Sequence, residues 1–181
     1  MKKDLILFFD CGDTLIDEST QVMDDEGNVL QAEAIGDAVN VMLGLYKEGY
    51  RIALVADGRV RSFRNILCGL GIDHIFEKWI ISEEVGVEKP NALMFSTAMA
   101  EMNLRDKDKS RIVMVGNNIK RDILGANEMG ITSILVSFTP RYSMKAETPE
   151  ETPDYVVALP DELPQLVDLL NRQVQNRNIL G

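Results

Sequence analysis

Short apolar runs alternate along the chain with stretches of helical periodicity. The first run, residues 5–9, has five consecutive apolar residues and is followed directly by Asp10. A run of this length without polar alternation is typical of a strand that is buried on both faces. Similar apolar runs predict further strands at residues 51–56, 79–82, 112–115, 134–136 and 155–157. Apolar residues at helical spacing predict helices at residues 38–46, 59–70, 91–102, 120–128 and 160–171.

Strands that alternate with helices predict an α/β fold in which a doubly wound, mostly parallel sheet forms the middle of three layers. Apolar pairs on either side of a Gly-Asn turn predict a β-hairpin within residues 16–33. We expect residues 1–181 to form a single domain, with residues 16–33 inserted as a hairpin flap. The polar tail, residues 172–181, is expected to fray.

Composition and charge exclude several classes of function. The 181 residues carry a formal net charge of −10, which disfavours binding to nucleic acid or to an anionic membrane. No apolar run reaches membrane-spanning length, and Cys11 and Cys68 do not make a disulfide framework. We therefore expect a cytoplasmic protein with no nucleic-acid or membrane partner. His74 is the only histidine, so zinc sites built from several histidines are excluded.

Polar residues follow several of the predicted strands directly. Asp10, Asp57 and Asn117 come at or just after strand ends, Lys89 lies in the loop after the third strand, and Asp122 follows Asn117 by five residues. Taken singly, each has a structural explanation, such as turn formation or a favourable place in the first turn of a helix. Because ligands bind at the carboxyl ends of parallel strands, we expect these side chains to surround one crevice.

These residues fall, in order, into four motifs that resemble those of the haloacid dehalogenase (HAD) superfamily. The strand followed by Asp-x-Asp-x-Thr is matched by residues 9–15, and the strand that ends in Ser or Thr is matched in position by residues 54–58. The Lys-Pro motif is residues 89–90, and the Gly-Asp motif with its second Asp is residues 116–122. The resemblance implies a HAD-like Rossmannoid fold and a hydrolase.

The resemblance also implies a role for each matched position. In the phosphatases of this family the first Asp attacks phosphorus and forms an aspartyl-phosphate, and Asp10 has that position. The implied catalytic residues are Asp10, Lys89 and Asp122. The implied substrate contacts are Ala56, Asp57, Gly58 and Lys89. The implied ligands of a Mg²⁺ cofactor are Asp10, Gly12, Asn117 and Asp122.

Three matched positions depart from the family pattern. Gly12 replaces the carboxylate that acts as general acid, and loss of such a group removes a factor of about 10²–10⁴ in rate. Ala56 replaces a hydroxyl that holds a phosphate oxygen, and Asn117 replaces a charged magnesium ligand, so metal affinity should fall. Asp13 is a candidate substitute acid or ligand, although its side chain could instead cap the following turn.

Neither place at which HAD proteins carry a cap domain holds one here, so the chain resembles the minimally capped members. An open crevice suits a phosphorylated small molecule or a phosphorylated macromolecule, or is closed by a second subunit of a homo-oligomer. The sequence thus predicts a Mg²⁺-dependent phosphatase with a modified site. One alternative is a catalytically impaired protein that binds a phosphorylated ligand or a protein partner. A second alternative is metal-independent, dehalogenase-type hydrolysis.

Overall fold

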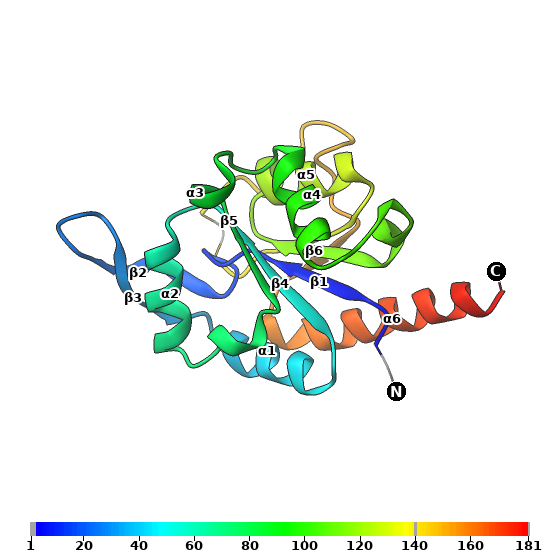
Figure 1. Cartoon of the computed structure of the whole chain (residues 1–181), viewed down its shortest axis with the longest axis horizontal. Coiled ribbons are helices and arrows are strands. Elements are labelled where there is room, and N and C mark those ends of the chain that lie inside the picture. Colours follow the sequence, from blue (N-terminus) through cyan, green and yellow to red (C-terminus); the bar gives the residue numbers. More distant parts are fainter. Residues whose placement is uncertain (1–2, 140, 181) are drawn as a thin grey trace.

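A six-stranded sheet, parallel throughout, lies between two layers of helices in the computed structural model, which describes residues 3–139 and 141–180 (Figure 1). Its strand order is β5–β4–β1–β6–β7–β8, which confirms the predicted doubly wound α/β fold. The strands of the sheet are β1 (Ile6–Phe9), β4 (Arg51–Ala56), β5 (Lys78–Ile81), β6 (Ile112–Gly116), β7 (Thr132–Val136) and β8 (Tyr155–Val157). The α-helices are α1 (Ala38–Lys47), α2 (Val60–Gly69), α3 (Ser82–Val85), α4 (Ala92–Glu101), α5 (Leu124–Met129) and α6 (Leu163–Leu180).

Strand β1 lies in the middle of the sheet because its side chains are apolar on both faces. Leu7 and Phe9 pack into the cluster formed with α1, α2 and α6, whereas Ile6 and Phe8 pack into the cluster formed with α4 and α5. All four side chains are fully buried. The two helix layers therefore enclose β1 completely, and its carboxyl end delivers Asp10 to one edge of the sheet.

The predicted hairpin is present as a separate two-stranded antiparallel sheet, β2 (Ile16–Met23) and β3 (Val29–Ala34). It projects beyond the central sheet beside α2 (Figure 1). Helix α2 holds β3 through two hydrogen bonds: Val29 N donates to Ser62 Oγ at 2.9 Å, and Asn65 Nδ2 donates to the backbone oxygen of Val29 at 2.9 Å. These two bonds attach the hairpin to α2, in the helix layer next to the carboxyl ends of the parallel strands.

Two segments differ from their predicted structure. The helix expected at residues 120–128 begins as one turn of π-helix, η3 (Ile119–Ile123), and only then continues as α5. Helix α6 continues to Leu180 and so includes residues 172–180, which were expected to lie beyond the last helix. Val174 explains this extension, since it lies one helical turn after Leu170 and is buried in the same apolar cluster. Residue 181 lies outside the described residues.

Three short 3₁₀ turns complete the described elements: η1 (Asp73–Ile75), η2 (Asp106–Arg111) and η4 (Pro160–Glu162). Within the described ranges, no helix combines the length and the apolar character needed to cross a bilayer.

Candidate active site

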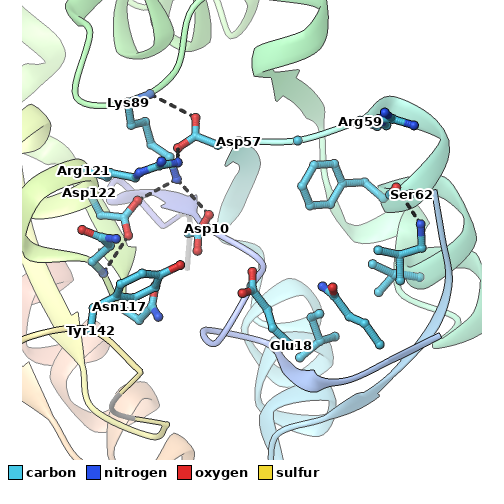
Figure 2. Close-up of a pocket in the computed structure, with 18 of the residues that line it drawn as sticks. Asp10, Glu18, Asp57, Arg59, Ser62, Lys89, Asn117, Arg121, Asp122 and Tyr142 are labelled. Atoms are coloured by element: carbon cyan, nitrogen blue, oxygen red, sulfur yellow. Dashed lines mark hydrogen bonds and ion pairs between the residues drawn. The ribbon is translucent and has the colours of Figure 1, made fainter. Parts of the chain in front are cut away.

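The side chains of Asp10, Lys89 and Asp122 meet at the carboxyl edge of the sheet, although they are far apart in sequence (Figure 2). Lys89 Nζ donates hydrogen bonds to Asp10 Oδ1 at 2.8 Å and to Asp122 Oδ1 at 2.6 Å. Its third hydrogen bond goes to the backbone oxygen of Val55 in β4 at 2.8 Å. All three donor positions of the ammonium are therefore used, and the two carboxylates are held side by side.

Burial and charge act against each other in this triad. Burial disfavours the ammonium of Lys89, but attraction to Asp10, Asp122 and Asp57 outweighs it and raises the pKa of Lys89 above its usual value. Burial raises the pKa of Asp122, and the Lys89 ammonium opposes that rise. The shared cation is what allows two buried carboxylates to stand next to one another.

The backbone around Asp10 and Asp122 explains how each is placed. Asp10 N donates to the backbone oxygen of Val115 at 3.0 Å, which extends the β1–β6 pairing by one residue. Asn118 N donates to Asp122 Oδ2 at 3.0 Å, which orients the carboxylate back toward the strand end. A Cβ added at Gly116 would overlap the Asp122 carboxylate, so the glycine leaves the space that this side chain occupies.

A cavity of about 260 Å³ opens above the triad, bounded by the ends of the strands, η3, α2 and the hairpin. Four carboxylates and three cations line it, so the lining carries a net charge of −1 when all are ionised. The carboxylates are Asp10, Glu18, Asp57 and Asp122, and the cations are Arg59, Lys89 and Arg121. Its apolar wall consists of Ile16, Val29, Phe63 and Ile66.

The expected substrate contacts of the second motif divide into two groups. Asp57 and Gly58 line the cavity, whereas Ala56 is fully buried in the core and does not. Asp57 is held by its neighbours, because Lys89 N donates to its Oδ1 at 3.0 Å and Arg121 Nη1 donates to its Oδ2 at 3.1 Å. Ala56 therefore contributes packing rather than a contact with a ligand.

Asn117 presents a side chain that needs a partner. It is only 2% exposed, lines the cavity, and its Nδ2 has no hydrogen-bond partner among the described residues. Buried polar groups are rarely left unpaired, so this amide is suited to contact a ligand. Asp10, Gly12, Asn117 and Asp122 all line the cavity, and they offer hard oxygen atoms from two carboxylates, one amide and one backbone carbonyl. Mg²⁺ binds through one or two carboxylates and keeps several waters, so this set fits Mg²⁺.

Asp13 does not face the cavity, which corrects its interpretation as a substitute acid or metal ligand. Its side chain is fully buried, forms an ion pair with Arg141, and accepts a hydrogen bond from Glu18 N at 3.1 Å. Its backbone has a φ of 49°. The alternative interpretation as a turn-capping residue agrees with these contacts, because the carboxylate binds the backbone that follows the turn.

No sequence motif indicates three further residues that line the cavity: Glu18, Arg121 and Tyr142. Arg121 directly precedes the motif residue Asp122, and this position was the only signal for it in the sequence. In the structure it forms ion pairs with Asp57 and Glu88. Tyr142 comes from the long loop before β8. Burial raises the pKa of Glu18, and repulsion from Asp13 and Asp10 adds to that effect.

Comparison with known families and proteins extends these observations. A family model described as haloacid dehalogenase-like hydrolase matches residues 10–136, a range that contains all four motifs. The glyceraldehyde 3-phosphate phosphatase of Methanothermobacter thermautotrophicus is 33% identical over 140 residues, covering 74% of this chain and 57% of the relative. The protein of that name from Pyrococcus furiosus is 32% identical over 137 residues, covering 75% of this chain and 54% of the relative. The chain spans about half the length of these curated relatives.

Solved structures share the fold at low sequence identity. The crystal structure of the HAD-hydrolase YfnB from Bacillus subtilis, bound to magnesium, has a TM-score of 0.72 and 16% identity, covering 92% of this chain and 99% of that chain. A HAD phosphatase from Thermococcus onnurineus has a TM-score of 0.72 and 16% identity, covering 92% of this chain and 98% of that chain. At these identities the likeness concerns the fold.

Proposed function

Because this chain belongs to the haloacid dehalogenase-like hydrolase family, we propose that it is a magnesium-dependent phosphatase that hydrolyses small phosphate monoesters. One observation carries the proposal: Lys89 holds Asp10 and Asp122 together at the floor of a cavity beside the strand ends. A carboxylate nucleophile at the base of an accessible cavity is suited to attack a bound phosphoryl group.

The cavity favours a small substrate over a macromolecule. Its volume of about 260 Å³ lies just below the range of roughly 300–1,000 Å³ that is typical of ligand pockets. The relatives named above are glyceraldehyde 3-phosphate phosphatases, and a Thermus thermophilus relative is named phosphoserine phosphatase. Phosphate esters of three-carbon compounds are therefore the first substrates to test. Arg59 and Arg121 are among the residues that line the same cavity, and arginine suits an anionic substrate.

The proposed reaction proceeds in two steps on Asp10. A carboxylate oxygen of Asp10 attacks phosphorus, and the bond between phosphorus and the alcohol oxygen breaks. Water then attacks the phosphoryl group on Asp10, which releases inorganic phosphate and restores the carboxylate. Lys89 fixes one oxygen of Asp10 through its 2.8 Å hydrogen bond, which limits the rotation of the nucleophile.

Charge explains why a divalent cation belongs in the proposal. The lining already has a net charge of −1, so a phosphate dianion would be repelled from it. Bound Mg²⁺ would neutralise the nucleophile and the phosphoryl oxygens and so allow their approach. Asp10, Asp122, Asn117 and the Gly12 carbonyl would hold it. Because Asn117 is neutral where the family carries a carboxylate, we expect weaker binding of the ion than in those relatives.

The test compares wild-type protein with Asp10→Asn on glyceraldehyde 3-phosphate and phosphoserine, with and without Mg²⁺. We expect turnover that requires the cation and falls by at least roughly 10³-fold in Asp10→Asn, because the nucleophile is lost. Asp25→Asn at the exposed hairpin tip removes the same charge outside the cavity and should match wild type. Wild type that binds phosphate but never turns over would instead identify a non-catalytic binding protein. Halide release from a 2-haloacid without metal would identify a dehalogenase.

A further inference from the structure

The carboxylate of Glu18 occupies the space in which a side chain at position 12 would stand. A Cβ built on Gly12 would overlap Glu18 Oε1, and it would lie 2.8 Å from Glu18 Cδ and 3.2 Å from Glu18 Cγ. The three nearest atoms that this Cβ would meet outside the adjoining residues all belong to Glu18. Glu18 also lines the cavity, and Figure 2 shows its side chain pointing toward Asp10.

The loop between β1 and β2 brings Glu18 back over Gly12. Leu15 N and Ile16 N both donate to the backbone oxygen of Cys11, at 2.8 and 3.2 Å, which closes a tight turn. Glu18 N then donates to Asp13 Oδ1 at 3.1 Å, and Arg141 pairs with the Asp13 carboxylate from the other side. Asp13 thereby fixes the backbone from which Glu18 enters the cavity.

Glu18 differs from the other carboxylates of the cavity in its contacts. Asp10 and Asp122 are held by Lys89, and Asp57 is held by Arg121. Glu18 makes one ion pair in the described part of the chain, with Arg141 Nε at 3.7 Å, which is beyond hydrogen-bond distance. Its side chain is 34% exposed and lines the cavity.

We propose that Glu18 is the proton donor and acceptor of the phosphatase reaction, supplying from β2 the carboxyl group that Gly12 lacks. This inference rests on the function proposed above. When the bond between phosphorus and the alcohol oxygen breaks, the bonding electron pair goes to that oxygen, which takes the proton of the Glu18 carboxyl group. In the second step the Glu18 carboxylate takes a proton from water as the water oxygen attacks phosphorus on Asp10. The bond between Asp10 and phosphorus breaks, and Glu18 is protonated again.

The first test compares two leaving groups that differ in their need for a proton. An alkoxide needs a proton as it departs, whereas 2,4-dinitrophenolate does not. We expect Glu18→Gln to slow the first turnover of an alkyl phosphate such as glyceraldehyde 3-phosphate by about 10²–10⁴-fold. The initial burst of 2,4-dinitrophenolate from its phosphate ester should stay within a few-fold of wild type. The second step then lacks its base, so the phosphorylated enzyme should accumulate and be seen by intact-protein mass spectrometry.

The matched control is Glu33→Gln, which removes an exposed carboxylate from the same hairpin outside the cavity and should match wild type in every assay. Equal losses on both esters, or no loss on either, would overturn the role of Glu18 while leaving the phosphatase proposal intact. Absence of turnover in wild type on every ester would instead reject the phosphatase proposal itself.

The second test moves the carboxylate from position 18 to position 12. Glu18→Ala removes the three nearest atoms that a Cβ at position 12 would meet, so we expect Gly12→Asp to be accommodated in that background. We expect Glu18→Ala alone to lose the hydrolysis of alkyl phosphates and the double variant Gly12→Asp/Glu18→Ala to regain most of it. Thermal melts of all variants separate folding from chemistry. A folded double variant that is as slow as Glu18→Ala would reject the inference, because restoring the carboxylate would then have had no effect.

Discussion

Gly116 is the residue on which the placement of Asp122 depends. The last residue of β6 lies directly under the Asp122 carboxylate, and any Cβ there would overlap Asp122 Cγ and Oδ2. The Asp122 carboxylate cannot move away easily, because its Oδ1 accepts a hydrogen bond from Lys89 Nζ and its Oδ2 accepts one from Asn118 N. The glycine of the fourth motif is therefore required by packing around a charged side chain rather than by backbone conformation.

Gly116→Ala should therefore impair the site more than the fold. We expect kcat/KM on the best phosphate ester to fall roughly 10²-fold, because a catalytic group is displaced by about 1 Å. Overpacking should also lower the free energy of unfolding by about 1–3 kcal/mol in urea titrations. Gly44→Ala in α1 is the control, since its Cβ would meet nothing within 4 Å. It should keep full activity and gain up to about 1 kcal/mol of stability. Equal activity of both variants would contradict this account.

At the same scale, the sequence predicts the three residues that meet at the strand ends, but it does not predict every residue of the cavity. Asp10, Lys89 and Asp122 are predictable because each lies at a strand end or in a recognisable motif. Glu18 is not, because its place depends on how the turn after Cys11 folds back, which no spacing rule specifies. Asp13 is the opposite case. Its position next to Gly12 suggests a substitute for the missing acid, but its side chain pairs with Arg141 instead.

At the scale of elements, the sequence pattern predicts the strands and the ends of α1, α2 and α4 well, but not those of α5 and α6. All six strands of the sheet lie within two residues of their predicted ranges, because a strand buried on both faces has no polar position to confuse the pattern. The π-turn at η3 was not predictable, because it differs from an α-helix only in which carbonyl each N–H reaches. The length of α6 depends on tertiary contacts of Val174 and Asn171, which a polar sequence conceals.

Asn171 joins α6 to the start of β1 and provides a test of that extension. Its Oδ1 accepts hydrogen bonds from Asp4 N at 2.9 Å and from Leu5 N at 3.1 Å, and the residue is only 3% exposed. Asn171→Ala would leave these donors without their acceptor, so we expect the free energy of unfolding to fall by about 1–3 kcal/mol in urea titrations. Asn176→Ala, on the exposed face of the same helix, should change it by less than about 0.5 kcal/mol. Equal stability of the two variants would show that the end of α6 is not anchored through Asn171.

At the scale of the whole molecule, charge determines how metal binding should be measured. A chain with net charge −10 attracts divalent cations at many places on its surface, so a simple response to Mg²⁺ says little about the cavity. The cavity differs from the surface because its carboxylates are buried and lie close together, with Asp10 and Asp122 both bound to Lys89. A specific ion would bind the folded chain only, whereas surface attraction weakens with salt.

Magnesium should therefore raise the melting temperature of wild type at constant ionic strength set with NaCl. At one hundred times the dissociation constant, binding to the folded state alone adds about 2.7 kcal/mol, or roughly 5–10 °C for a chain of this size. The rise should shrink strongly in Asp10→Asn, because one of two charged ligands is lost, and should persist in Asp25→Asn, because Asp25 lies at the exposed hairpin tip. Differential scanning calorimetry across a Mg²⁺ series measures all three proteins. If Asp10→Asn responded as fully as wild type, the ion would bind outside the cavity, and the proposed magnesium site would be rejected.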